Sequence, residues 1–319
     1  MNPAVLEPPV LSLAIPCYNE EAVLDVFLER VRGVLEPMGV SYELVFVNDG
    51  SRDATLAMLL KARDGDDRIK VIDLSRNFGK EAALTAAIVN SSGEAVIPID
   101  ADLQEPPELI PQMVAKWREG YEMVTARRSS RNTDTFKKRF TAQSFYKVFN
   151  KISETQLPFD TGDYRLMDRK VVDAFERMPE CNRFMKGIFA WLGFKQAEVT
   201  FERDERAAGE SKFTFWKLLR FALRSIFAFS SAPLKVWFYL GLFFSTCSFG
   251  YGSFLIIRTL IFGADVAGYA SIMVVTLFLG GIQLIGLGVL GQYMGYIYNE
   301  VKRRPLYLVR EIYGVCGKK

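Results

Sequence analysis

The stretch Val96-Ile97-Pro98-Ile99-Asp100-Ala101-Asp102-Leu103-Gln104-Glu105-Pro106-Pro107 decides the fold that we expect for this chain. Its apolar, β-branched beginning predicts a buried strand, and the two prolines at its end stop that strand before a helix. Asp100 and Asp102 therefore follow a strand directly, at the end where open α/β sheets bind ligands. Two carboxylates and the amide of Gln104 form an all-oxygen site that suits Mg²⁺ or Mn²⁺ bound together with substrate phosphates. A bare Asp-x-Asp is more often a solvated loop or a helix cap, so the assignment depends on its surroundings.

The same order of strand, polar end and helix occurs three times before this stretch. Strands are expected at residues 10–15, 42–47 and 69–74, and each is followed by polar residues and then by a helical pattern. This repetition predicts an α/β fold with a doubly wound, mostly parallel sheet, whose strand ends meet along one edge. We expect that edge to be the functional site. Asp49 and Glu20 also fit ordinary roles, in a turn and in the first turn of a helix, and those roles are compatible with ligand binding.

Composition excludes several classes of function. The 319 residues carry 40 basic and 37 acidic side chains, for a net charge of +3, so the chain lacks the overall basicity of a nucleic-acid-binding protein. It contains no histidine, which excludes Ser-His triads, histidine metal clusters and histidine general bases. The four cysteines are scattered and are expected to be reduced thiols. Residues 1–9 do not resemble a signal peptide.

The last third of the chain predicts membrane insertion. Residues 236–257 and 266–299 are free of charged side chains, and each run is long enough to cross a bilayer. Residues 258–265 would connect them as a short external loop. Lysines and arginines before the first run and after the second place both termini and the first domain in the cytoplasm. The expected organisation is a catalytic domain at 1–212, an amphipathic juxtamembrane helix at 213–235, two transmembrane helices at 236–301 and a cytoplasmic tail at 302–319.

Three further segments carry candidate ligand-binding residues. Arg127 and Arg131 follow an expected strand at 123–126 and are candidates for phosphate binding, although the basic segment that they begin would equally suit a solvated helix or an anionic membrane surface. Asp163 lies in a short run that we interpret as an edge strand returning to the site. The loop at 201–212 contains Arg206, Ser211 and Lys212, which would either close over phosphates or remain solvated.

Six motifs occur in order along the chain: Pro16-Cys17-Tyr18-Asn19-Glu20, Val47-Asn48-Asp49-Gly50-Ser51, Ser75-Arg76-Asn77-Phe78-Gly79-Lys80, Asp100-Ala101-Asp102-Leu103-Gln104, Gly162-Asp163-Tyr164-Arg165-Leu166 and Gly209-Glu210-Ser211-Lys212. Together they resemble glycosyltransferase family 2, whose fold is called GT-A. The resemblance is closest to its polyisoprenyl-phosphate glycosyltransferases, the group that includes the bactoprenol glucosyltransferases and dolichol-phosphate mannose synthase. It covers almost the whole chain, and the Gln-x-x-Arg-Trp motif of processive polysaccharide synthases is absent, which favours a single transfer per acceptor.

The resemblance implies a role for each candidate residue. Asp100, Asp102 and Gln104 would hold the metal ion and the diphosphate. Asp102, Asp163 and Arg206 would take part in catalysis, with Asp163 orienting the sugar or the acceptor. The remaining assignments are Pro16, Tyr18, Glu20, Asp49, Lys80 and Asp100 for the nucleotide-sugar, and Arg127, Arg131, Ser211 and Lys212 for the diphosphate and the acceptor phosphate.

The implied activity is that of a metal-dependent hexosyltransferase in the bacterial inner membrane. It would transfer a hexose, with inversion, from a UDP-sugar to polyprenyl (undecaprenyl) phosphate at the cytoplasmic face, for the modification of cell-envelope glycans such as lipopolysaccharide. Glucose is the first choice, and galactose, N-acetylhexosamine, mannose from GDP-mannose and aminoarabinose remain open. A non-catalytic scaffold that binds nucleotide-sugars is a second hypothesis. The resemblance also favours a homo-oligomer, with a tetramer as one form.

Overall fold

The computed structural model describes residues 9–128, 161–178, 180, 183, 185–201, 232–262 and 268–314. The chain divides into two compact units. The first, here called the sheet unit, contains residues 1–147, 155–214 and 304–319, and the second, the helix unit, contains residues 148–154 and 215–303. Residues 304–314, which follow the second long helix in the sequence, therefore belong to the sheet unit.

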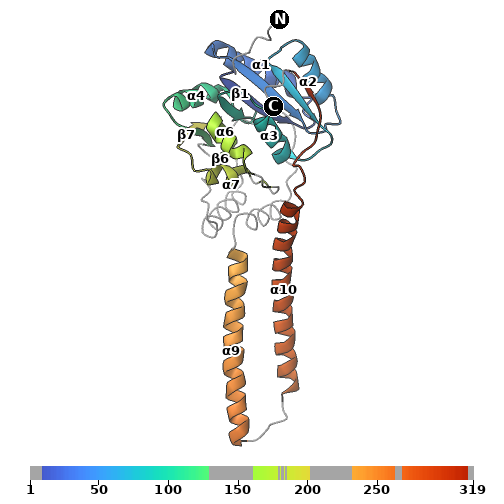
Figure 1. The fold of residues 1–319 in the computed structure, drawn as a ribbon, viewed down its shortest axis with the longest axis vertical. Coiled ribbons are helices and arrows are strands. Elements are labelled where there is room, and N and C mark those ends of the chain that lie inside the picture. Colours follow the sequence, from blue (N-terminus) through green and yellow to red (C-terminus); the bar gives the residue numbers. More distant parts are fainter. Residues whose placement is uncertain are drawn as a thin grey trace. The chain divides into compact units, whose positions relative to one another are not determined.

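The sheet unit is built on one eight-stranded mixed sheet in the order β7-β5-β6-β4-β1-β2-β3-β8 (Figure 1). β4, β1, β2 and β3 are parallel neighbours, which confirms the parallel arrangement expected from the repeated strand–helix pattern. β6 runs antiparallel to both β4 and β5, and β8 runs antiparallel to β3. The strands are β1 Leu11–Cys17, β2 Tyr42–Asn48, β3 Ile69–Leu74, β4 Ala95–Pro98, β5 Met123–Arg128, β6 Thr161–Asp168, β7 Gln196–Phe201 and β8 Val309–Tyr313.

Helices cover both faces of this sheet because its central strands are apolar on both faces. On β1, Leu13 and Ile15 belong to the core shared with α1, α2 and α4, while the intervening Ala14 is buried on the face that α3 covers. On that second face α6 and α7 join α3. The helices are α1 Leu24–Leu35, α2 Thr55–Asp64, α3 Lys80–Val89, α4 Ile110–Arg118, α6 Arg169–Glu176 and α7 Met185–Trp191, with short 3₁₀ turns η1 Glu36–Met38 and η2 Pro107–Leu109.

The expectation that Asp163 and Arg165 lie on an edge strand is wrong. Their strand, β6, lies inside the sheet between β5 and β4. The charged residues made this run look half solvated, but Arg165 is only 4% exposed and places its guanidinium 4.1 Å from the centre of the Phe189 ring. Tyr164 and Leu166 are buried as well, so both faces of β6 are covered. A covered strand can occupy the interior of a sheet.

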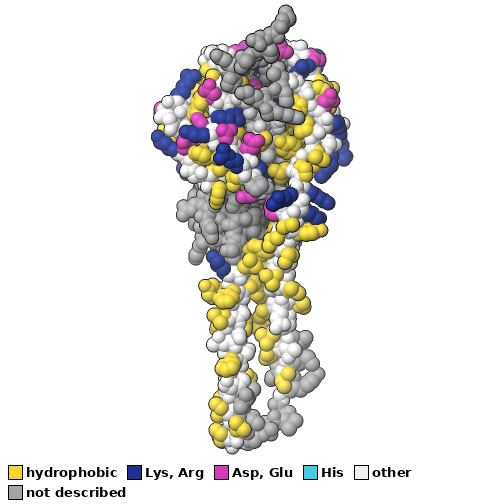
Figure 2. Space-filling model, in the orientation of Figure 1, with side chains coloured by type: hydrophobic (Ala, Val, Ile, Leu, Met, Phe, Trp, Pro, Cys, Tyr) yellow, Lys and Arg dark blue, Asp and Glu magenta, His cyan; other side chains and the backbone are white. Residues whose placement is uncertain are grey.

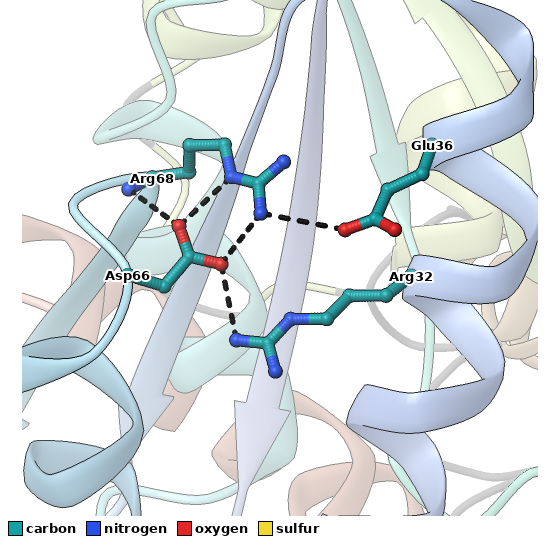
Figure 3. A network of polar contacts seen from close by, with 4 residues as sticks. All are labelled: Arg32, Glu36, Asp66 and Arg68. Atoms are coloured by element: carbon teal, nitrogen blue, oxygen red, sulfur yellow. Dashed lines mark hydrogen bonds and ion pairs between the residues drawn. The ribbon is translucent and has the colours of Figure 1, made fainter.

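A polar network stabilises the amino-terminal end of β3 (Figure 3). It lies at the opposite end of this strand from the candidate site described below. Asp66 accepts hydrogen bonds from Arg68 Nε at 2.8 Å and from Arg32 Nη2, on α1, at 3.0 Å. Arg68 Nη2 also lies 3.6 Å from a carboxylate oxygen of Glu36. The network ties α1 and η1 to the connection between α2 and β3.

The helix unit contains two long apolar helices, α9 Ala232–Phe262 and α10 Tyr269–Val301. Both expose large apolar side chains, which appear in yellow in Figure 2. Among the described residues, one stretch, Phe278–Val301, has the length and composition of a membrane span. A pair of crossings therefore stays a prediction. Of the juxtamembrane helix expected at 213–235, residues 213–231 lie outside the described part of the chain.

Candidate active site

The loops that follow β1 and β2 are joined by hydrogen bonds at the carboxyl ends of these parallel strands. Asn19 N donates to Ser51 Oγ at 3.1 Å, and the Asn19 side chain accepts from Arg52 N at 2.8 Å. Glu20 N donates to Thr55 Oγ1 at 2.8 Å. The first two sequence motifs therefore form one surface, as expected from parallel strands whose ends meet at the same edge.

Asp49 connects this surface to the loop that follows β3. Its two carboxylate oxygens accept hydrogen bonds from Phe78 N at 2.7 Å and from Gly79 N at 2.9 Å, and its side chain is buried. Burial raises the pKa of Asp49, and the two backbone donors oppose that effect. The residue predicted to contact the nucleoside therefore also fixes the backbone just before α3.

Gly50 allows the loops after β2 and β3 to approach so closely. Its φ of +64° lies in the left-handed region, and a Cβ there would lie 2.6 Å from Asn77 N and 2.7 Å from Arg76 C. Both conditions select glycine, because a side chain would be strained and would also collide with backbone atoms. Asn77 Nδ2 strengthens the junction by donating to Asp49 O at 3.2 Å.

Lys80, the first residue of α3, lies close to a carboxyl group of β6 and to one in the loop that follows β4. Its Nζ is 2.5 Å from Asp100 Oδ2 and 3.9 Å from Asp163 Oδ2. Although burial opposes it, the Asp100 and Asp163 carboxylates raise the pKa of the Lys80 ammonium, which is therefore charged at neutral pH. The structure thus brings together three residues predicted from separate motifs.

Two glutamates complete this cluster, and neither of them was predicted from the sequence. Glu105 accepts a hydrogen bond from Asp100 N at 3.2 Å, and burial followed by the Asp100 charge raises its pKa to about 8. Burial followed by the Asp163 charge raises the pKa of Glu81 to about 8. Glu81 directly follows Lys80, and Glu105 directly follows Gln104. This proximity to predicted residues was the only sequence signal for the two glutamates. The carboxyl cluster is defined here as Lys80, Glu81, Asp100, Glu105 and Asp163.

The turn after Asp100 is held in an uncommon conformation. Leu103 has a φ of +58°, in the left-handed region that branched residues avoid, and its side chain is buried. Asp102 Oδ1 accepts a hydrogen bond from Gln104 N at 3.1 Å, closing a tight turn around Leu103. Burial of the Leu103 side chain offsets this backbone strain, and the strain coincides with the predicted metal-binding residues.

The donor set of this turn suits a hard divalent cation. Asp100 and Asp102 supply carboxylates, and Mg²⁺ typically binds one or two such groups while substrate phosphates and water complete its shell. Within the described residues, no group of three or more Cys, Asp or Glu side chains has the arrangement of a self-sufficient metal site. The two aspartates therefore fit a cation that arrives with a phosphorylated substrate.

Side chains of β6 hold the backbone of the site in place through hydrogen bonds. The Tyr164 hydroxyl donates to Pro106 O at 2.8 Å, which fastens the end of the stretch that contains both aspartates. Arg165 Nη2 donates to Gly162 O at 2.7 Å, and its Nε donates to Asp163 O at 3.3 Å. A buried guanidinium thus fixes the backbone that carries the Asp163 carboxylate.

The other residues predicted for the site have no contact with the carboxyl cluster among those described above. Pro16 lies near the end of β1, paired in register with Val47, and Tyr18 in the following loop is 41% exposed. Arg127 forms an ion pair with Glu198 of β7 at 3.0 Å. Arg131, Arg206, Ser211 and Lys212 lie outside the described residues, so their roles stay predictions.

Comparisons with known proteins show which sequences and structures this chain resembles. The model of the family described as "Glycosyl transferase family 2" matches residues 12–175. A protein from Synechocystis sp. named as an uncharacterized glycosyltransferase is 55% identical over 305 residues, covering 96% of each chain. The SfII prophage-derived bactoprenol glucosyl transferase of Shigella flexneri is 50% identical over 301 residues, covering 94% of this chain and 97% of that one. The crystal structure of glucosyl-3-phosphoglycerate synthase from Mycobacterium tuberculosis is 17% identical, with a TM-score of 0.46, over 69% of this chain and 76% of that one.

Proposed function

The chain belongs to glycosyl transferase family 2, and from this premise we propose that it transfers glucose from UDP-glucose to a polyprenyl phosphate. The observation that carries the proposal is the near-complete alignment, at 50% identity, with a protein named as a bactoprenol glucosyl transferase. The carboxyl cluster supports it, because the cluster lies at the strand ends where α/β sheets bind ligands. The exposed apolar helices support a lipid acceptor.

In this proposal the chain contributes positioning and charge rather than a general base. A phosphate monoester has a second pKa of about 6, so the acceptor oxygen is already largely ionised at neutral pH. That oxygen attacks the anomeric carbon of the glucose, and the bond from this carbon to the UDP oxygen breaks, with inversion. The Lys80 ammonium, 2.5 Å from Asp100, would offset the negative charge that gathers where the diphosphate departs.

A divalent cation, Mg²⁺ or Mn²⁺, would be held by Asp100 and Asp102, with Gln104 beside them. When bound, it would supply further positive charge for the diphosphate. The hydrogen bond from Gln104 N to Asp102 Oδ1, at 3.1 Å, would hold the Asp102 carboxylate in position for the cation. The proposal includes both metal ions, and the assay below supplies each of them.

The helix unit would anchor the enzyme as a hairpin of two crossings. α9 and α10 have 31 and 33 residues, longer than the roughly 20 that a crossing requires. Within this unit the rings of Phe244 and Phe278 contact each other edge to face, with centroids 5.9 Å apart. Lys302, Arg303 and Arg304 directly after α10 favour a cytoplasmic C-terminal end. The sheet unit would then face the cytoplasm, where UDP-sugars are present.

A donor screen tests the reaction. Purified full-length protein is incubated with undecaprenyl phosphate, Mg²⁺ or Mn²⁺, and labelled UDP-glucose, UDP-galactose, UDP-N-acetylglucosamine or GDP-mannose in turn, and glycolipid is measured. We expect product chiefly with UDP-glucose. Asp102→Asn should reduce the rate at least about 100-fold, as expected when a group that organises transition-state charge is lost. Asp67→Asn, at an exposed position between α2 and β3, is the matched control and should retain the rate.

The same screen separates the enzyme from a scaffold. If UDP-glucose binds but none of the donors yields glycolipid, the protein is a nucleotide-sugar-binding scaffold and the proposed reaction is wrong. Product with a different sugar would retain the reaction and correct the donor. Full activity after chelation of divalent cations would remove the metal ion from the proposal.

A further inference from the structure

The C-terminal strand β8 places a cation against a buried carboxylate of the neighbouring strand. Arg310 Nη1 lies 3.0 Å from Asp73 Oδ2, and Arg310 Nη2 donates to Ser75 O at 2.8 Å. The backbone is joined at the same place, because Ser75 N donates to Leu308 O at 2.9 Å. Only residues 302–308 separate this strand from the end of α10. Arg310 therefore holds both the end of β3 and the first residue after it.

Asp73 also contacts β2, through its second carboxylate oxygen. Its Oδ1 accepts a hydrogen bond from Asn48 Nδ2 at 2.7 Å, and the Asn48 side chain in turn accepts from Ser51 N at 3.2 Å. The turn at residues 48–51 contains Asp49 and Gly50, which hold the loop before α3. A continuous series of contacts thus runs from Arg310 through Asp73 and Asn48 to the predicted nucleoside-binding turn.

Burial makes this series specific. Asp73 and Asn48 are 1% and 2% exposed, so neither side chain can exchange its partner for bulk water at low cost. The amide of Asn48 has one orientation in which its nitrogen donates to Asp73 while its oxygen accepts from Ser51. Loss of Arg310 would remove the positive charge that lies 3.0 Å from the buried Asp73 carboxylate, and an uncompensated buried charge destabilises the arrangement around it.

We propose that Arg310 is a positioning residue for the nucleotide-sugar, so that a residue C-terminal to the second long helix helps to set donor affinity. The inference rests on the proposed function for the identity of the donor. Arg310 does not touch the reacting groups. It keeps Asp73 aligned, Asp73 keeps Asn48 aligned, and Asn48 shapes the turn that presents Asp49.

The test compares Arg310→Met with wild-type full-length protein in detergent. Steady-state glycolipid synthesis should show an increase of about tenfold in the KM for UDP-glucose, while kcat at saturating donor stays within about threefold. The Kd for UDP, measured by calorimetry, should rise by a similar factor. Arg310→Lys restores the positive charge beside Asp73 and should recover most of the affinity. Glu311→Gln changes the residue of β8 that pairs in register with Asp73 but whose carboxylate accepts from the Tyr313 hydroxyl at 2.7 Å, and both constants should stay unchanged.

Two outcomes would overturn the inference. In the first, Arg310→Met leaves the KM for UDP-glucose and the Kd for UDP within twofold of wild type. In the second, kcat falls in proportion to the loss of folded protein while KM is unchanged, which identifies a purely structural role. If the wild-type protein makes no glycolipid, the proposed function fails, but the comparison of UDP affinities still decides the role of Arg310.

Discussion

At the scale of single residues, the carboxyl cluster depends on one ammonium group. Four carboxyl groups surround or adjoin Lys80, and two of them, Glu81 and Glu105, have a pKa of about 8. A raised pKa favours the protonated form of each glutamate, which lowers the negative charge of the cluster. Lys80 pairs with Asp100 and lies near Asp163, so it is the group best placed to balance the charge that remains.

Replacing Lys80 with methionine tests this balance. The Lys80→Met variant keeps a long apolar stem but loses the charge 2.5 Å from Asp100. We expect kcat/KM for UDP-glucose to fall about 100-fold, because a preorganised charge beside the leaving diphosphate is removed. Lys116→Met is the matched control, since Lys116 pairs with Glu119 on the surface at 2.9 Å, and it should stay within about twofold of wild type. Wild-type kcat/KM in Lys80→Met would contradict the assigned role.

The network around Asp66 should affect stability and leave catalysis unchanged (Figure 3). The Arg68 guanidinium donates to Asp66 and holds the pKa of that carboxyl below its ordinary value. The folded state thus binds this proton less tightly than the unfolded chain. The resulting stabilisation is present above the ordinary pKa of about 4 and is lost as the pH falls through the lower folded-state value.

The corresponding prediction concerns Asp66→Asn. At pH 7 the substitution should lower the free energy of unfolding by about 1–2 kcal/mol, since Asp66 is mostly buried while its arginine partners are partly exposed. Denaturant unfolding at pH 7 and near pH 3 should show that the difference from wild type shrinks in acid. The KM for UDP-glucose should not change, because the network lies before β3 and the site lies after it. A difference that grows in acid would refute the pKa argument.

Sequence reasoning identified the residues of the cluster that stand in recognisable patterns and missed the others. Asp100 and Lys80 were predicted because each occurs in a motif at a strand or helix end. Glu81 and Glu105 gain their properties from burial beside other carboxyl groups, and burial of this kind depends on β6, which is distant in sequence. The function of Arg310 was hidden for the same reason, since its partner Asp73 is 237 residues away.

At the scale of elements, Gly50 decides whether the loops after β2 and β3 can meet. Gly50→Ala should be destabilising by about 3 kcal/mol or more, because it combines a left-handed φ with a Cβ 2.6 Å from Asn77 N. Gly39→Ala is a matched control, since its φ is +63° but no atom lies within 4 Å of the added Cβ, and it should cost only about 1 kcal/mol. Thermal unfolding of both variants measures the difference. Equal losses would show that the close approach contributes nothing.

The elements that sequence predicted well are those specified locally. β1 to β4 each combine an apolar run, a polar end and a helical pattern, so their parallel arrangement was correctly predicted. β6 was expected at an edge, and β8 was not predicted as a strand, because antiparallel pairing with β4 and β3 joins segments far apart in the chain. Strand propensity depends on such neighbours, and a single sequence does not reveal them.

At the scale of the whole molecule, the chain leaves its sheet unit and returns to it. The long helices α9 and α10 interrupt the sheet unit between β7 and β8, and β8 then completes one edge of the sheet. If α9 and α10 cross a bilayer as proposed, both connections to the sheet unit must lie on the same side of the membrane. An odd number of crossings would separate β8 from β3. The pairing of β8 with β3 within one chain therefore favours an even number.

The proposed hairpin predicts the accessibility of two positions, one at each of its ends. In a variant without native cysteines, Phe262→Cys at the end of α9 should react with a membrane-impermeant maleimide in intact spheroplasts. Lys302→Cys, directly after α10, should react only after permeabilisation. Glycolipid synthesis by each variant would verify that its fold is retained. Labelling of Lys302→Cys in intact spheroplasts would contradict the proposed orientation, because the end of α10 and the sheet unit that contains β8 would then lie outside. Protection of Phe262→Cys would contradict the hairpin itself, because α9 would then not cross the bilayer.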